Sequence, residues 1–557
     1  MRQFTPTTEV DFVVIGSGAA GGIMAKQLSV AGFSVVVLEQ GGWGKYGHEQ
    51  DYTKDEWLND NPSPEDRLMS DPGGRQPNTF RRTEKDKAVP GNHSYGCVVG
   101  GGTVTYGGSS WRHLPYEFNE LSHDKTIPSG TGMADWPITY QELEPYYVQA
   151  EWEMGISGLR VDSPFFAPMS KPYPVAPLPL KSSGALFETA AAKLGLTSVP
   201  SPMAIISEPY MGRAACVHCG MCSGFGCHVR ARSSSAVTMI PIAEKTGRCE
   251  IRANSYVREI SVDNNGRVTG VIYFDAQKRE IQQRAKAVVL SANASESARL
   301  LLLSKSARFP NGLANANGIV GRYLMLGGGA GASGLYEHPL NEYKGMISAA
   351  GIIDWVPSDP KRGFYGGGRL TARGHTTPID FGLGGLQPGS PRWGAAYKKA
   401  LKEEANHKMT VTCFVTQMPL ETNRVDLDPD LKDAWGLPAM RITSQSHPDD
   451  IKCMEFFRQK SLEILEASGA KKVWAGPVND SRGGAHNRGT CRMGNDPKTS
   501  VVNKFHRAHE VPNLFVVDGS NLVTGGRNHP TMTIQALAFR AAENIVRAAK
   551  AGTLEKL

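Results

Sequence analysis

At 557 residues the chain is too long for one ordinary hydrophobic core, so we expect two domains or one large α/β domain with a substantial added layer. Its 61 basic and 54 acidic residues are dispersed, without a long basic run interleaved with aromatic residues, which argues against nucleic acid as a partner. No segment reaches the ~18 to 20 consecutive apolar residues that cross a bilayer, and Met1–Asp11 lacks an apolar signal-peptide core. We therefore expect a cytoplasmic protein with no direct membrane insertion.

The first predicted element is a βαβ unit. A short β-branched strand over 11–15 runs into Gly16-Ser-Gly18-Ala-Ala-Gly21, and an apolar helical stripe follows these glycines. A second strand over 34–38 ends at Glu39. Because the glycine motif stands between a strand and a helix and is followed by an acidic residue at the expected distance, it predicts a dinucleotide-binding half-site.

Each residue of this fingerprint has a physical task. Gly16 makes the tight turn, Gly18 lets backbone amides approach the pyrophosphate, and Gly21 lets the helix pack on the strand. Glu39 is placed to accept hydrogen bonds from ribose hydroxyls. Other candidate dinucleotide elements lie far along the chain, so a long cofactor wrapped by distant segments, FAD, is favoured over NAD.

Further elements follow in chain order. The region from about 44 to 92 is polar and rich in Pro and Gly, which predicts a surface excursion rather than a core element. The glycine-dense stretch 98–108 indicates close approach of the backbone to another group. The remaining predicted elements are a hairpin over 254–260 and 270–274, strands over 287–292, 408–417 and 513–518, and helices over 296–303, 449–468 and 533–550.

Four of the nine cysteines crowd into one short segment: Cys216, Cys219, Cys222 and Cys227. An odd total without a secretion signal argues against a disulfide framework. The spacing resembles the first half of a ferredoxin run, so one interpretation is an iron–sulfur cluster held by the four thiolates. Zinc, with His218 replacing one thiolate if needed, is a second interpretation, and packed thiols without metal are a third.

The most specific motifs lie near the C-terminus. They are His486-Asn-Arg-Gly-Thr-Cys-Arg-Met-Gly, the strand end Asp518-Gly519, and Asn528-His-Pro-Thr-Met-Thr-Ile534. Earlier motifs in the same series are Gly16 to Gly21 with Glu39, Val99-Gly-Gly-Gly-Thr-Val-Thr-Tyr-Gly-Gly, Trp111-Arg112, Trp136-Pro-Ile, Leu143-Glu-Pro-Tyr146 and Ser291-Ala-Asn-Ala-Ser-Glu. In this order they resemble the glucose–methanol–choline (GMC) oxidoreductase family over nearly the whole chain. Within it, the chain is most similar to bacterial FAD-dependent sugar, gluconate and glycoside dehydrogenases and to pyranose oxidases.

The resemblance implies an α/β fold with two domains. A discontinuous Rossmann-type FAD-binding domain is expected over 1–125, 200–330 and 481–557. A substrate-binding domain built on an antiparallel sheet is expected over 126–199 and 331–480.

The resemblance also implies contacts to the cofactor. Gly101, Gly102 and Thr105 are expected against the flavin and pyrophosphate. The backbone of Val257 is expected at the adenine end, and Asp518 with Gly519 at the ribityl and pyrophosphate groups. Some relatives link FAD covalently through a histidine in the glycine-rich loop. Because Thr105 stands at that position here, we expect non-covalent FAD.

Alcohol oxidation needs a base, since the carbon loses a hydride to flavin N5 while the hydroxyl loses a proton. His486 matches the base of the family, and an ordinary histidine pKa near ~6.5 suits that task. The second family position is His or Asn. The Pro-Thr-Met-Thr frame favours His529, and Asn528 is the alternative because the alignment could slip by one residue.

These observations predict an FAD-dependent oxidoreductase that oxidises a secondary hydroxyl, at C2 or C3 of a sugar, glycoside or aldonic acid, to a ketone. Oxygen, a quinone or a protein partner would accept the electrons, and the activities considered include glycoside 3-oxidase, pyranose oxidase and gluconate dehydrogenase. The rival from another class is a flavin and iron–sulfur electron-transfer subunit of a membrane-associated dehydrogenase complex. A thiol oxidoreductase using Cys219 and Cys222 is disfavoured, because such enzymes place the cysteine pair near the first βαβ unit.

Overall fold

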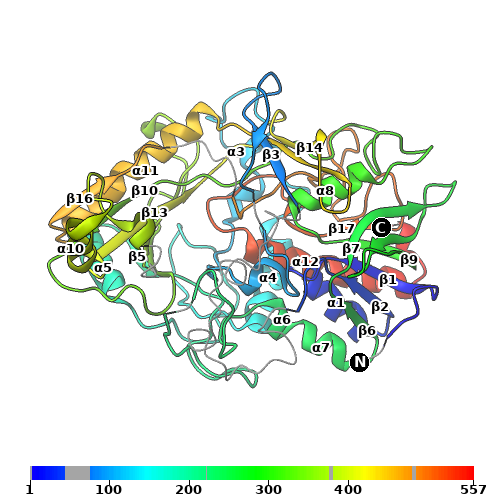
Figure 1. Cartoon of the computed structure of the whole chain (residues 1–557), viewed down its shortest axis with the longest axis horizontal. Coiled ribbons are helices and arrows are strands. Elements are labelled where there is room, and N and C mark those ends of the chain that lie inside the picture. Colours follow the sequence, from blue (N-terminus) through cyan, green and yellow to red (C-terminus); the bar gives the residue numbers. More distant parts are fainter. Residues whose placement is uncertain are drawn as a thin grey trace.

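The computed structural model describes residues 3–43, 76–93, 95–220, 222–374, 381–478 and 484–556. Its strands form three sheets of seven, six and four strands (Figure 1). The seven-stranded first sheet and the six-stranded second sheet lie at opposite ends of the view in Figure 1. In the ranges just given, no helix is both long enough and apolar enough to span a bilayer.

The first sheet is built around a parallel core. β1 (Val10–Ile15) pairs in parallel with β2 (Val35–Leu38) and with β9 (Glu280–Leu290). β6 (Cys249–Arg252) extends the sheet beyond β2, and β17 (Leu514–Val516) pairs in parallel with β9. All four residues of β2 are buried, as expected for a parallel strand covered on both faces.

The predicted Rossmann unit is confirmed. α1 (Gly21–Val30) follows β1 directly and contacts α12 (Thr531–Lys550), which in turn contacts α4 (Tyr140–Met154). The predicted hairpin is also confirmed, as β7 (Tyr256–Val262) and β8 (Val268–Phe274) pair antiparallel and continue the sheet from β9. The fold is therefore of the predicted α/β class.

The second sheet is antiparallel throughout, in agreement with the predicted substrate-binding layer. In spatial order its strands are β16 (Lys472–Ala475), β10 (Gly331–Leu335), β13 (Lys408–Val415), β12 (Gly368–Arg373), β11 (Ser348–Ile352) and β5 (Ser198–Pro200). α11 (Pro448–Ala467) packs on β10 and β13, and α5 (Ser182–Lys193) packs on β11. The two helices and one face of the sheet enclose a separate hydrophobic core.

The third sheet corrects one expectation. β3 (Asn78–Arg81) pairs in parallel with β15 (Pro438–Thr443) and antiparallel with β4 (Val89–Pro90), and β14 (Arg424–Lys432) completes this sheet. Residues 78–90 therefore do not belong to a simple surface excursion, and residues 44–75 of that predicted excursion lie outside the described ranges. β3 buries only Phe80, so its four residues carry too little apolar pattern to mark a strand.

Shorter helices, 3-10 turns and the π-helical turn η4 connect these elements. They are η1 (Gly101–Val104), η2 (Pro115–Phe118), α3 (Glu120–His123), α6 (Ser235–Thr238), α7 (Ile240–Lys245), α8 (Ala294–Leu303), η3 (Pro360–Arg362), η4 (Phe381–Gly385), α10 (Gly394–Glu404), η5 (Gly519–Asn521) and η6 (Leu554–Lys556). The segments assigned to the FAD-binding domain supply every strand of the first sheet. The exact domain boundaries stay predictions.

Candidate active site

A cavity of about 640 Å³ lies at the carboxyl edge of the first sheet. The chain leaves β1 at Gly16, β2 at Glu39, β9 at Ser291 and β17 near Asp518, and all four residues line the cavity. Because parallel strands end at a common edge, residues far apart in sequence meet there, as is typical of ligand sites in open α/β sheets. Residues of the second sheet close the opposite side, so the cavity has two distinct walls.

The glycines of the first wall have two different tasks. Gly16 has a φ of +93°, and a Cβ atom there would lie 2.4 Å from the Ser291 carbonyl oxygen. A Cβ atom on Gly21 would lie 2.0 Å from the carbonyl oxygen of Gly16, so this glycine permits the tight packing of the turn. By contrast, a Cβ atom on Gly18 or Gly102 would meet no atom closer than 3.9 Å. These two glycines leave room in the cavity for a ligand.

Glu39 is buried at the cavity wall and is held by protein donors. Its Oε2 atom accepts hydrogen bonds from the Ser17 amide (3.0 Å) and hydroxyl (2.7 Å), and its Oε1 atom accepts one from the Gly41 amide (3.0 Å). Burial raises the pKa of Glu39, and these hydrogen bonds oppose the rise. The carboxylate is therefore fixed beside the fingerprint turn, where the sequence places a ribose contact.

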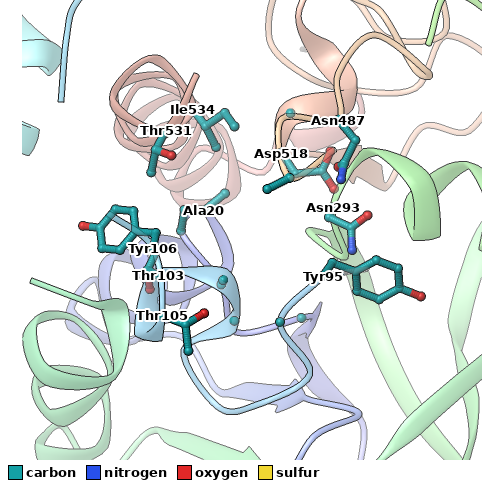
Figure 2. A pocket seen from close by; sticks show the side chains of 18 of the residues that line it. Ala20, Tyr95, Thr103, Thr105, Tyr106, Asn293, Asn487, Asp518, Thr531 and Ile534 are labelled. Atoms are coloured by element: carbon teal, nitrogen blue, oxygen red, sulfur yellow. The ribbon is translucent and has the colours of Figure 1, made fainter. Parts of the chain in front are cut away.

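The glycine-rich loop lies against this turn. The Gly100 amide donates to the Ser17 hydroxyl at 2.9 Å, and a Cβ atom on Gly101 would lie 2.8 Å from the Cα atom of Gly18. Figure 2 shows Thr103, Thr105 and Tyr106 of this loop on one side of the cavity. Thr105 lines the cavity, as predicted.

On the other side, Figure 2 shows Asp518, Asn487 and Asn293. Asp518 accepts hydrogen bonds from the Ser297 hydroxyl (2.5 Å) and the Ser520 amide (2.8 Å). Gly519, Gly101 and Val257 also line the cavity, so every predicted cofactor residue except Gly21 contributes to its wall. Gly21 lies behind the wall and supports the turn.

Two histidines project into the same cavity. The ring centroids of His486 and His529 lie 5.0 Å apart, and the rings are nearly perpendicular at 85°. Phe414, on β13, packs on both rings, with centroid distances of 3.9 Å to His529 and 5.4 Å to His486. The second sheet thus holds the two imidazoles against each other.

Both imidazoles are neutral at physiological pH. Burial, together with the positive charges of Arg488 and Arg373, lowers the pKa of His486 to about 3. Burial and the neighbouring His486 and Arg373 lower the pKa of His529 well below its ordinary value. This corrects the expectation of an ordinary histidine pKa: His486 is a weaker base than the sequence suggests. A neutral imidazole still carries one N–H donor and one acceptor nitrogen, so each ring is able to take a proton.

The structure separates the two alternatives for the second family position. His529 lines the cavity, and its Nδ1 atom has no hydrogen-bond partner among the described residues. The side-chain amide of Asn528 instead donates to the backbone carbonyl of Arg112 at 3.0 Å. Asn528 is buried behind the cavity wall, so the arrangement favours His529 as the residue that faces a substrate.

Sequence reasoning missed several lining residues, namely Tyr95, Asn293, Asn487, Phe414 and Arg373. The sequence could have predicted Asn293 as a cavity residue, because it follows the end of a buried parallel strand, as Glu39 does. Its Oδ1 atom also caps α8 by accepting from the Ser295 amide at 2.9 Å. Phe414 and Arg373 carried no local signal, since only the pairing of β12 with β13 brings them to the cavity.

The cysteine segment lies close to the cavity. Ser223 and Gly224 line it, and the Gly224 amide donates to the carbonyl of Thr105 at 2.8 Å. All four cysteines are half-buried and outside any disulfide, and burial raises the pKa of Cys216 to about 11. Among the residues with described positions, no group of three or more His, Cys, Asp or Glu side chains is arranged to hold a metal ion. The iron–sulfur and zinc interpretations therefore stay predictions.

Comparison with known proteins identifies the family. Models of the N-terminal and C-terminal parts of GMC oxidoreductases match residues 11–326 and 419–538. The chain belongs to the GMC oxidoreductase family. This GMC oxidoreductase is a flavoprotein with FAD as its cofactor, and it acts on CH–OH donors.

Relatives match over nearly the full length of the chain. It is 36% identical to 2-methyl-1,2-propanediol dehydrogenase from Mycolicibacterium austroafricanum, over 98% of this chain and 96% of that protein. It is 30% identical to the gluconate 2-dehydrogenase flavoprotein from Pantoea cypripedii, over 96% of this chain and 93% of that protein. A solved formate oxidase variant from Aspergillus oryzae RIB40 has a TM-score of 0.68 at 14% identity, covering 99% of this chain and 100% of that one. This last likeness supports the fold.

Proposed function

We propose that this GMC oxidoreductase oxidises a secondary hydroxyl group of a sugar, glycoside or aldonic acid to a ketone, with His486 as the base. The observation that carries the proposal is the pair of neutral imidazoles, His486 and His529, facing the cavity. Relatives named for action on gluconate, fructose and paromamine, each 29% or 30% identical, favour a sugar-like substrate.

The two histidines have different roles: one accepts the hydroxyl proton and the other orients the substrate oxygen. FAD, when bound, accepts the hydride that leaves the carbinol carbon. His486 takes the hydroxyl proton on its free ring nitrogen, which leaves a carbonyl product and an imidazolium. His529 donates its N–H to the substrate oxygen and orients it toward His486, and Phe414 limits rotation of the His529 ring.

The residues of the first wall fit a dinucleotide. Gly18 and Gly102 leave space where side chains would fill the cavity, and the start of α1 supports a phosphate through its free amides and dipole. Glu39 and Asp518 line the same cavity, which supports them as partners of the ribose and ribityl hydroxyls.

We further propose that FAD is bound non-covalently. The histidines that line the described part of the cavity are His486 and His529, and Thr105 stands in the loop where some relatives carry the linking histidine. Acid precipitation of the protein should release FAD into the supernatant. Flavin that stays with the protein pellet would contradict this proposal.

The experiment that tests the function is an anaerobic absorption spectrum of the purified protein before and after addition of alcohols. The panel contains gluconate, glucose, a methyl glucoside, fructose and a 1,2-diol. Bleaching of the flavin band near ~450 nm by a sugar or sugar acid supports the proposal. Bleaching by the diol alone would overturn the sugar class but keep the alcohol chemistry.

Iron assayed on the same sample tests the cysteine segment. In their described positions the four thiols do not form a metal-ligand set, so the proposed hydride and proton transfers involve no cluster. About three or four irons per chain would establish one and favour a protein partner as electron acceptor over oxygen or a quinone. Protein purified without iron that still reacts with substrate would exclude the cluster and leave zinc and packed thiols as the remaining interpretations.

A further inference from the structure

Arg373 ends the strand β12 and projects into the cavity. Along this strand side chains alternate between two faces. Leu370 and Ala372 are buried in the core of the second sheet, whereas Thr371 and Arg373 line the cavity. The backbone of Arg373 is fixed between Ser348 of β11 and Thr410 of β13, so the position of its side chain is set by the sheet.

The guanidinium of Arg373 differs from those of the buried arginines in its contacts with protein groups. Arg112, Arg299 and Arg527 each pair with two carboxylates. Arg369, two residues earlier on the same strand, is buried with its guanidinium 4.5 Å from the Trp111 ring centroid. The Arg373 side chain is exposed and has no hydrogen bond or ion pair to any residue within the described ranges.

Among the described lining residues of the cavity, the acidic ones are all on the first wall. Glu39 is bonded to Ser17 and Asp518 to Ser297. Glu296 forms an ion pair with Arg299 at 3.3 Å. The described lining residues on the other wall are Ile347, which precedes β11, and Ser348, Thr371, Arg373 and Phe414 of the second sheet. None of them is a carboxylate that could balance the guanidinium. The described residues on the substrate side of the cavity therefore carry a net positive charge beside His486 and His529.

We propose that Arg373 binds a carboxylate of the substrate, so that the preferred alcohols are hydroxy acids of the aldonic or uronic class. This inference rests on the proposed function, since it places the substrate against the same two histidines. The planar guanidinium offers paired N–H donors that match a carboxylate. Among the described residues of this wall, no acid competes for them. The FAD phosphates are not the expected partner, because Gly18 and the start of α1 lie on the opposite wall.

The test compares substrates that differ in the carboxylate alone. Gluconate is paired with glucitol, which carries CH2OH in place of the carboxylate, and glucuronate is paired with glucose. In the wild type, kcat/KM should favour the acid of each pair. In Arg373→Gln the ratio of acid to neutral kcat/KM should fall by about 10- to 100-fold, the range of a charged hydrogen bond, and in Arg373→Lys it should fall less.

Two controls separate this effect from others. Arg284→Gln removes one positive charge from an exposed arginine paired with Glu9, and it should leave the ratio unchanged. FAD content and the flavin midpoint potential of each variant are measured alongside. A potential shift in Arg373→Gln with an unchanged ratio would mean that Arg373 serves the flavin, and it would overturn the inference.

A binding experiment keeps the inference independent of turnover. Glutarate, a dicarboxylate without a hydroxyl group, is titrated into the oxidised holoenzyme and followed by the flavin spectrum. We expect Arg373→Gln to raise its Kd at least about tenfold. Equal affinity in the two proteins would overturn the inference even if alcohols reduce the flavin. If no alcohol reduces the flavin but glutarate binding depends on Arg373, the proposed function fails and the carboxylate site stands.

Discussion

The two walls of the cavity are built differently. The first wall consists of strand ends and glycines, and its acidic side chains are held by protein donors, as Glu39 is held by Ser17. The second wall consists of alternate residues of antiparallel strands, among them Phe414 and Arg373, which has no ion-pair partner among the described residues. A wall made of backbone and fixed side chains suits a constant cofactor. A wall made of side chains alone is free to differ between relatives that act on different alcohols.

The largest expected effect concerns the histidines between the walls. His486→Ala removes the proposed base, so flavin reduction by substrate should slow at least ~100-fold while FAD content is retained. Single-turnover stopped-flow absorbance measures the rate. His338→Ala changes an exposed histidine and serves as the matched control. An unchanged rate in the His486 variant would remove this residue from the chemistry.

A substitution that fills space in the first wall should lower the FAD content of the protein. Gly102→Val adds a side chain where no atom lies within 4 Å, so it fills cavity space without a clash in the protein itself. We expect FAD per chain to fall about tenfold or more, because the added atoms occupy space needed by the ligand. The purified protein is assayed by absorbance and its fold by circular dichroism. Gly476→Val, at an exposed glycine also free of contacts, should keep full FAD content; equal FAD in both variants would contradict the assignment.

The same contrast explains what the sequence could predict. Gly16, Gly18 and Glu39 sit within one βαβ unit, so local periodicity and spacing were enough to place them. Phe414 and Arg373 reach the cavity only through the pairing of β12 with β13, which no local pattern encodes. The strand β3 was not predicted for a related reason: its partner β15 lies more than 300 residues away in the chain. No local periodicity or spacing marks His486 and His529 as site residues. Their prediction depended on the family resemblance.

A smaller effect should follow from the packing between the walls. Phe414→Leu keeps an apolar side chain but removes the aromatic ring that lies 3.9 Å from His529. We expect flavin reduction to slow about tenfold, because His529 gains freedom to rotate away from the substrate oxygen. Phe456→Leu makes the same change in the second core, away from the cavity, and should reduce thermal stability without slowing the reaction. Similar rates in the two variants would show that Phe414 only fills space.

The smallest effect is a pH dependence that should be nearly flat. Since burial and the charges of Arg488 and Arg373 lower the pKa of His486 to about 3, the ring stays neutral and able to accept a proton from alkaline pH down to about 4. Flavin reduction by a neutral alcohol should therefore vary by no more than about twofold between about pH 5 and 8. A decline with a midpoint near the ordinary histidine pKa of ~6.5 would contradict this.

The pH profile of the Arg373→Gln variant tests whether Arg373 acts on the base. Removing one positive charge beside the ring makes its protonated form less unfavourable, so the pKa of His486 rises and the acid limb of the profile moves to higher pH. The shift should be smaller than the change in acid-to-neutral selectivity, because burial is the main cause of the low pKa and stays in place. An acid limb that stays in place while selectivity collapses would mean that Arg373 acts on the substrate alone and not on the base.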